Sequence, residues 1–472
     1  MSARAGMTLR EIAAGLRAGA FDSRALIEEA IAARAAVVGV LDAYCHWAPE
    51  TARAMADEAD ACFAAGLDAG GLQGIPVSVK DLFGLTGMPM FAGSPHLLPE
   101  RFGRDGPVVG RLRAGRAVFM GKTHTSEIGF GVCGTNVHWG TPRNPWDAHA
   151  VRPAGGSSSG AAISIVEGSS WLALGSDTGG SAREPANMTG IVGVKLTHGR
   201  WPGEGLVPPG PSLHGPGLLA RSVDDASFGF AAIDLTCDAG ELARATSETR
   251  AAGLTVGVLD IYFWDGAAPG IAEAVTRAIG EIAGAGATVV ASALPEAREL
   301  AAISAEWDFG ISAVELYEFL DSELPMLLPT LHRGAKRQLE LRKDLPAREY
   351  LRRQRVLARL RASADARCRA FDVLVCPTSP LSPPLLTELE DPDTYHEVSR
   401  QAARNCCVAN LLDLCALTMP VGLDAAGLPV GMQLVAAHGQ EERLLAAGCA
   451  FERVLGTGVE RIGRPPLLGG WQ

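Results

Sequence analysis

Two serine-bearing glycine loops lie close together in this sequence and constrain how the chain can fold. The first spans residues 154–160 and the second spans residues 175–181, and the segment between them has room for one short helix and one short strand. Loops at the two ends of a single such unit can face each other. Ser157 of the first loop and Ser181 of the second could therefore belong to one site.

A short strand upstream supplies a basic side chain for the same site. Residues 74–81 have the pattern of a strand, in which successive side chains alternate between two faces. Val77 and Val79 then point one way, whereas Ser78 and Lys80 point the other. Two serines and such a lysine can form a catalytic site in which a serine is the nucleophile and the lysine, rather than a histidine, is the base.

Short apolar strands alternate with glycine-rich loops and helices from about residue 71 to residue 235. This alternation is typical of an α/β sheet covered by helices on both faces. A helix expected at 271–284 lies between two further strands and forms another strand–helix–strand unit. Besides 74–81, the strands are expected at residues 117–120, 171–174, 191–194, 254–259, 287–290, 371–376 and within 417–434.

No internal repeat or low-complexity linker divides the chain, which favours one large domain. Its start is helical, because Thr8 and Glu11 form a capping box and Asp22 precedes a second, longer helix. From about residue 300 the composition becomes charged and poor in glycine, which predicts a helical insertion over the sheet. The expected parts are N-terminal helices (1–65), an α/β core with the catalytic motifs (66–299), the helical insertion (300–370) and a return to the core (371–472).

The charge of the chain excludes several classes of partner. The formal net charge is −11 and no basic block or arginine stripe occurs, so neither a nucleic acid nor an anionic membrane surface is expected. Apolar runs stay below the 18 residues of a membrane span, and the first residues lack an apolar signal core. We expect a cytoplasmic protein that acts on a small neutral substrate, and the sequence leaves a homodimer open.

The cysteines indicate a reducing compartment rather than a metal site. All ten are spread along the chain without a C-x-x-C pair, and the nearest two, Cys406 and Cys407, are adjacent. That spacing is poor for a metal site or a redox motif. Most lie among apolar neighbours, as buried free thiols do in a cytoplasmic protein. The sequence predicts no metal and no cofactor.

A different serine chemistry is suggested by residues 156–160, which fit the G-x-S-x-G nucleophile elbow. Ser158 would then be the nucleophile, and the base would be His198, His214 or His438. An elbow follows a strand, however, and this segment follows a stretch that contains two prolines. The context therefore disfavours a serine–histidine–aspartate triad.

Two further glycine motifs also lack the context that they need. Residues 129–134 fit the dinucleotide fingerprint G-x-G-x-x-G, but they do not lead into a helix. Residues 115–123 miss the phosphate-binding loop by one position, since five residues rather than four separate Gly115 from Gly121. Neither motif predicts nucleotide binding.

Seven motifs together resemble those of the amidase signature family of hydrolases. They occur in the family's order along nearly the whole chain, and the 24 positions from Ser157 to Ser181 equal the family's spacing. The resemblance implies a single α/β domain with a mixed, helix-covered sheet, and hydrolysis of an amide or a related acyl bond. The motifs are residues 74–81, 121–123, 144–146, 155–158, 175–183, 190–195 and 427–431.

The resemblance also implies a role for each of the three central residues. Ser181 is the implied nucleophile, Ser157 the middle serine that the family holds with a cis peptide bond, and Lys80 the base. A lysine accepts a proton only when it is neutral, so Lys80 should be enclosed and hydrogen-bonded. Ser157 would relay the proton between Lys80 and Ser181.

The residues around this set are expected to stabilise it. Ser158, Asp177 and Arg183 are predicted to support the site without reacting, with the Arg183 guanidinium holding loops through its fork of donors. The turn before Arg183 lacks bulky side chains, which lets backbone N–H groups converge on the oxygen of a tetrahedral intermediate. The predicted oxyanion hole consists of Thr178, Gly179, Gly180 and Ser181.

The pocket is harder to predict. His214 stands where many family members have an aspartate, so it is expected at the pocket rim. A resemblance to fatty acid amide hydrolase over residues 121–146 implies a roomy, mostly apolar channel, partly roofed by the insertion around residues 307–326. The residues expected to line this channel are Gly129, Phe130, Gly131 and Cys133.

Two classes of function follow from the resemblance. The first is a stand-alone amidohydrolase for carboxylic amides, with aryl esters and carbamates as further candidates because the same acyl-enzyme chemistry serves each leaving group. The second is the glutamine-hydrolysing A-type subunit of an amidotransferase complex, which requires a protein partner. The sequence shows no convincing arginine and aspartate pair for binding glutamine, so we favour the first class.

Overall fold

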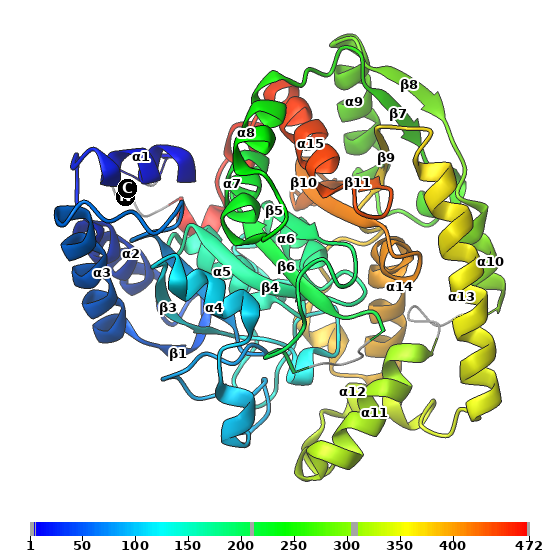
Figure 1. The fold of residues 1–472 in the computed structure, drawn as a ribbon. Coiled ribbons are helices and arrows are strands. Elements are labelled where there is room, and N and C mark those ends of the chain that lie inside the picture. Colours follow the sequence, from blue (N-terminus) through cyan, green and yellow to red (C-terminus); the bar gives the residue numbers. More distant parts are fainter. Residues whose placement is uncertain (1–3, 5, 208–211, 304–309, 470–472) are drawn as a thin grey trace.

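The computed structural model of this chain describes residue 4 and residues 6–207, 212–303 and 310–469. A single sheet of eleven strands runs through the described part, with helices packed around it (Figure 1). In spatial order the strands are β1 (Tyr44–Trp47), β3 (Val118–Thr123), β2 (Pro76–Lys80), β4 (Leu172–Asp177), β6 (Gly215–Ala220), β5 (Val192–Lys195), β10 (Cys415–Leu423), β11 (Pro429–Ala436), β9 (Val373–Pro377), β7 (Thr255–Val258) and β8 (Thr288–Ala291).

The sheet is mixed, as predicted. β3, β2 and β4 run parallel to one another, and so do β9, β7 and β8. Between these two groups, in the order β4, β6, β5, β10, β11 and β9, each strand is antiparallel to the next one. Since β2 and β4 are parallel, Lys80 and Asp177, their last residues, lie at the same edge of the sheet. This edge also receives the start of β6, where Gly215 pairs with Asp177.

Two groups of helices pack on the sheet. One consists of α5 (Ser159–Glu167), α6 (Arg183–Thr189) and α14 (Pro392–Leu411), and the other of α7 (Val223–Ile233), α9 (Ile271–Gly284) and α15 (Glu441–Leu455). The N-terminal helices α1 (Leu9–Arg17) and α2 (Ser23–Val37) begin at the predicted caps, Thr8 and Asp22. The remaining helices outside the insertion are α3 (Pro49–Ala64), α4 (Pro107–Ala114), α8 (Ala239–Glu248) and α16 (Gly458–Ile462).

The segment predicted as a helical insertion is helical over most of the part that the structure describes. It contains α11 (Ile311–Glu323), α12 (Arg333–Glu340) and α13 (Ala347–Cys368), and α10 (Pro295–Ile303) begins shortly before it. The long helix α13 runs beside α10 along one side of the molecule, while α11 and α12 lie at one end (Figure 1). The first residues of the predicted pocket roof, 307–309, lie outside the described residues.

No helix within the described ranges is both long enough and apolar enough to cross a lipid bilayer. The longest, α13, has 22 residues and carries arginines along its length.

Candidate active site

Lys80 lies at the centre of the candidate site, at the end of β2. Its side chain is fully buried, and its strand lies between β3 and β4. The side-chain nitrogen Nζ donates to Ser157 Oγ at 2.7 Å and to Ser176 Oγ at 2.9 Å. Burial holds the pKa of Lys80 well below its ordinary value, although the nearby Asp177 carboxylate acts in the opposite direction. The site therefore favours the neutral amine that a lysine base requires.

Ser157 and Ser181 are brought together by the loops that carry them. The Gly156–Ser157 peptide bond is cis, as the resemblance implies. The N–H of the next residue, Ser158, donates to the carbonyl of Ser181 at 3.1 Å and so ties the two loops to each other. Both serines are almost completely buried, at 1% and 4% exposed. In the described structure no hydrogen bond joins the two hydroxyl groups directly, so the hydrogen bond between the two loops at this point is the one between their backbones.

The turn at 178–181 presents free backbone donors next to Ser181. Within the described residues, no hydrogen-bond acceptor is found for the N–H groups of Thr178, Gly179 and Ser181. The N–H of Gly180, by contrast, donates to Asp177 Oδ1 at 2.9 Å. This corrects the prediction that Gly180 is one of four free donors. Gly180 instead allows the turn to form, because its backbone φ of 121° is a value that residues with a side chain rarely adopt.

A buried ion pair lies beneath this turn. The Arg183 guanidinium donates to both carboxylate oxygens of Asp177, at 2.9 and 3.1 Å, and both side chains are fully buried. Asn410 on α14 donates to Asp177 at 2.9 Å and accepts from Arg183 at 2.7 Å. Burial opposes ionisation of Asp177, but Arg183 and these hydrogen bonds hold its pKa below the usual range. Arg183 also donates to the Cys406 carbonyl and to Gln433, so one guanidinium joins α6 to α14 and β11.

Asp177→Asn is expected to destabilise the protein by about 3–5 kcal/mol, because it leaves a buried guanidinium without its counter-charge. The free energy of unfolding, measured by urea titration, provides the test. Glu100→Gln is the control, since the ion pair of Glu100 with Arg104 is exposed and 3.4 Å long and should contribute less than about 1 kcal/mol. An Asp177→Asn protein as stable as the wild type would show that the pair does not hold the turn.

The residues predicted to line the channel occupy two different surroundings. Gly129 lies beside the site, because a Cβ built on it would be 3.7 Å from Ser157 Oγ. Gly131 packs against α14, where a Cβ would clash with the Tyr395 hydroxyl. Cys133 is also turned toward α14 and contacts Ser399 Oγ at 3.4 Å. Contact with the substrate stays a prediction for all four residues, and Gly129 has the strongest geometric support for it.

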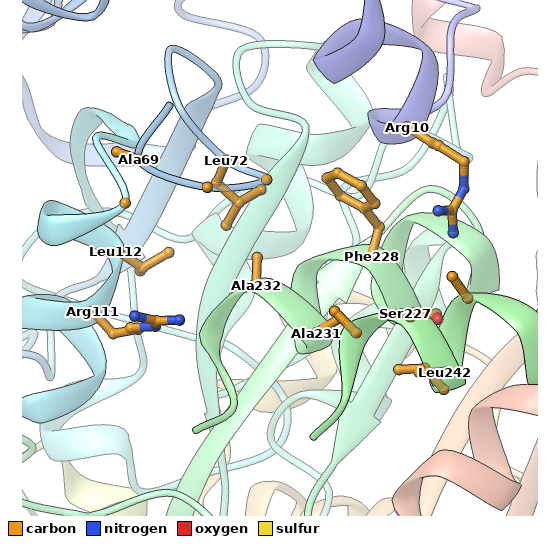
Figure 2. A pocket seen from close by; sticks show the side chains of 16 residues that line it. Arg10, Ala69, Leu72, Arg111, Leu112, Ser227, Phe228, Ala231, Ala232 and Leu242 are labelled. Atoms are coloured by element: carbon orange, nitrogen blue, oxygen red, sulfur yellow. The ribbon is translucent and has the colours of Figure 1, made fainter. Parts of the chain in front are cut away.

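A separate cavity of about 450 Å³ lies on another part of the molecule, between α1, α4, α7 and α8. Figure 2 shows its walls, with Leu72, Leu112, Phe228 and Leu242 around an apolar interior and the Arg10 and Arg111 side chains at its sides. None of the candidate catalytic residues lines it. This cavity therefore plays no part in the chemistry considered for Lys80 and the two serines.

Ser158 does not have the surroundings of an elbow nucleophile. It precedes α5 and follows a loop, and its hydroxyl donates to the Ser176 carbonyl at 3.2 Å while accepting from the Ser176 N–H at 3.3 Å. No histidine is bonded to it in the described structure. Among the candidate bases, His438 is exposed and lies 3.3 Å from the Asp413 carboxylate, whereas His214 is buried at the edge of the sheet where Lys80 lies.

Several residues of the site escaped the sequence reasoning. Ser176 is the second partner of Lys80, and Asn410 bridges Asp177 and Arg183. Lys122, at the end of β3, forms a buried ion pair of 2.8 Å with Asp81, the residue after Lys80. Ser176 and Lys122 both fall inside the quoted motifs, so the motifs themselves were a signal for them. Asn410 lies 233 residues from Asp177 along the chain, and no local pattern marks it.

Comparison with known proteins identifies the family. The model of the Amidase family matches residues 25–445, and the chain belongs to this family, which confirms the resemblance. It is an amide-cleaving hydrolase. Its α/β fold with a large mixed sheet is that of the structurally known amidases.

Three relatives show the extent of the similarity. The chain is 43% identical to 2-amino-5-chloromuconic acid deaminase from Comamonas testosteroni, over 98% of this chain and 99% of that protein. It is 35% identical to the A-type subunit of the glutamyl-tRNA(Gln) amidotransferase from Anaeromyxobacter sp. (strain K), over 95% of this chain and 96% of that protein. The structure of 6-aminohexanoate cyclic dimer hydrolase complexed with substrate matches with a TM-score of 0.84 at 25% sequence identity. The match covers 98% of this chain and 99% of that protein.

Proposed function

We propose that this enzyme hydrolyses the amide bond of a small substrate through an acyl-enzyme on Ser181, with Lys80 as the base and Ser157 as the proton relay. The observation that carries the proposal is the buried Lys80 Nζ at 2.7 Å from Ser157 Oγ, on the loop that is bonded to Ser181. Burial disfavours the charged form of a lysine, so a purely structural role would be better served by an apolar side chain.

The steps follow from this arrangement. Neutral Lys80 takes the proton of Ser157, which takes the proton of Ser181 as its oxygen attacks the amide carbonyl. The negative charge that develops on the carbonyl oxygen is stabilised by the free N–H groups of Thr178, Gly179 and Ser181. When the C–N bond breaks, the proton returns from Lys80 through Ser157 to the leaving amine. Water then attacks the acyl-enzyme by the same route and releases the acid.

The supporting residues keep these donors in place. The Asp177 carboxylate accepts from the N–H groups of Gly180 and Ala182, at 2.9 and 3.1 Å, and thereby shapes the turn that presents the other amides. Arg183 in turn fixes Asp177. Ser158 fixes its own loop to Ser176. We propose that Asp177, Arg183 and Ser158 act on the reaction through geometry and exchange no proton with the substrate.

We favour a stand-alone amidohydrolase over an amidotransferase component. The identity of 43% to a deaminase over nearly its full length exceeds the 35% to the amidotransferase relative. The deaminase is named for 2-amino-5-chloromuconic acid, which is a small molecule. A small amide that releases ammonia or an amine is therefore the proposed substrate class, with aryl esters and carbamates as further candidates.

A substrate panel assayed on the purified chain alone tests this choice. We expect hydrolysis of small aliphatic amides, p-nitroanilides or aryl esters without any added protein, since the proposed nucleophile, base and donors all belong to one chain. Glutamine should be a poor substrate. Released ammonia or nitroaniline is measured directly. Hydrolysis of glutamine alone, appearing only when a partner protein is added, would instead identify a component of an amidotransferase.

The thiols support a cytoplasmic location, which we propose for this enzyme. All ten cysteines are free, and seven of them are buried. Free thiols persist where the compartment is reducing. A homodimer stays a prediction, which the molecular mass in solution can test.

A further inference from the structure

His214 presents an unsatisfied imidazole at the edge of the sheet where the proposed base lies. The residue is 5% exposed, and neither ring nitrogen has a hydrogen-bond partner among the described residues. Burial holds the pKa of His214 well below its ordinary value, so the ring is neutral. His124, His198 and His396 each lack a partner at Nδ1, whereas His214 lacks one at both nitrogens within the same described ranges.

The sheet fixes His214 at the edge where the proposed catalytic residues lie. The residue after it, Gly215, begins β6 and pairs with Asp177 at the end of β4. On its other side β4 pairs with β2, which ends at Lys80. His214 and Lys80 therefore flank the strand end that leads into the turn at 178–181.

The helical insertion holds the chain just before His214. The Ser212 N–H donates to Glu315 on α11 at 3.1 Å, and Gln354 on α13 donates to Ser212 Oγ at 3.2 Å. Leu213 is buried in a cluster that includes Leu357 of α13. With β6 on one side and these anchors on the other, the backbone of His214 has a fixed position.

A buried polar group without a partner is unfavourable, and in native proteins such groups are rare. A neutral imidazole offers one N–H donor and one acceptor nitrogen. We propose that His214 contacts the substrate and selects amides that carry a hydrogen-bond acceptor, either a carboxylate or a carbonyl, over amides with a plain alkyl chain. This inference rests on the proposed function. His214 is then a specificity-determining residue, and the insertion contributes to specificity by holding it.

Three amides of similar size test the inference. Succinamate carries a carboxylate, 4-oxopentanamide carries a neutral carbonyl, and pentanamide carries neither. Their dissociation constants are measured by calorimetry in the Ser181→Ala protein, where turnover does not interfere. We expect one or both acceptor-bearing amides to bind about 10- to 100-fold tighter than pentanamide, because pentanamide would leave the buried imidazole without a hydrogen-bond partner. A preference for succinamate alone would identify a charged substrate.

Substitutions at His214 separate this contact from packing. In the Ser181→Ala background, His214→Phe should remove most of the preference, and His214→Gln should restore part of it through its amide donor. His214→Ala makes the same comparison without added bulk. The matched control is His124→Phe, because His124 is equally buried but has Asp42, Arg34 and Asp81 as its charged neighbours. This control should leave the preference unchanged.

The outcomes distinguish the inference from the proposed function. Equal binding of the three amides, no measurable binding of either acceptor-bearing amide, or a preference that survives His214→Phe and His214→Ala would overturn the role of His214. Turnover by the wild type tests the acyl-enzyme proposal separately. Binding that depends on His214 without any turnover of the bound amide would reject that proposal and leave the contact in place.

Discussion

Ser181→Ala should lower kcat/KM by about 10⁴- to 10⁶-fold for any amide that the wild type hydrolyses. The proposed nucleophile is the Ser181 hydroxyl, and the nearby Ser158 hydroxyl cannot replace it because it is committed to the backbone of Ser176. Steady-state kinetics measure the loss. A fluorophosphonate probe should label Ser181 in the wild type, which mass-spectrometric mapping can verify.

The matched control for this substitution is Ser158→Ala, in the loop that faces Ser181. We expect Ser158→Ala to retain most of its activity, since its hydroxyl supports the loop and does not react. The unfolding temperature of both variants should stay close to that of the wild type. Near-normal hydrolysis by folded Ser181→Ala, or a probe attached to Ser158, would overturn the assignment and restore the elbow hypothesis.

The regular part of the fold could be predicted from the sequence because its signals are local. The two-residue alternation at 74–81 and the apolar runs at 117–120 and 171–174 became β2, β3 and β4. The helix expected at 271–284 has those bounds. In each case the side-chain pattern by itself favours one type of element, and the tertiary structure agrees with it.

The strand β6 was not predicted, because the sequence at its start favours a turn. It begins Gly215, Pro216, Gly217, which is typical of a turn. Pairing with β4 on one side and β5 on the other makes it a strand nevertheless. Local propensity is a weak preference that such contacts override. The missed strand matters for function, since it places His214 at the edge where Lys80 lies.

The helix α14 was also missed, although its start carried a signal. Asp391 caps it by accepting from the Thr394 N–H, and Pro392 occupies the first helical position. An aspartate followed by proline is a common helix start. The helix supplies Asn410 to the buried ion pair, and this contact could not be inferred without knowing which elements pack together.

At the site, the sequence predicted which segments come together better than it predicted the hydrogen bonds between them. Lys80, Ser157 and Ser181 do lie in neighbouring segments, as their order predicted. The expectation of four free amides overlooked Asp177, whose side chain accepts from the N–H three residues later. Aspartate commonly bonds to the backbone of the turn that follows it, so the sequence contained this signal.

Lys80→Met should lower kcat/KM by about 10²- to 10⁴-fold, the usual contribution of a positioned base. Its rate should also lose its dependence on pH. Burial lowers the pKa of Lys80, and the lysine is active only when neutral, so the wild-type rate should rise as the pH increases through that lowered pKa. The measurement is kcat/KM against pH for both proteins. A Lys80→Met enzyme with full activity, or with an unchanged pH profile, would contradict the assignment.

Stability gives an independent test of the same lysine. In the unfolded chain Lys80 is protonated below about pH 10.4, whereas in the folded protein its depressed pKa keeps it neutral to lower pH. The unfolded state then binds more protons, so this residue makes the wild type less stable as the pH falls, by up to about 1.4 kcal/mol per unit. Lys80→Met removes the effect, and its stability advantage over the wild type should grow as the pH falls from about 10.

Lys122→Met is the control. Lys122 lies near the end of the neighbouring strand β3 and is the ion-pair partner of the buried Asp81, so the substitution deletes that partner. It should destabilise the protein by about 3–5 kcal/mol, since it leaves one charge of a buried pair alone. The two lysines lie at the ends of adjacent strands and are equally buried, yet their removal should change stability in opposite directions. If Lys80→Met destabilises the protein as Lys122→Met does, Lys80 is a structural cation, and the neutral base on which the mechanism depends does not exist.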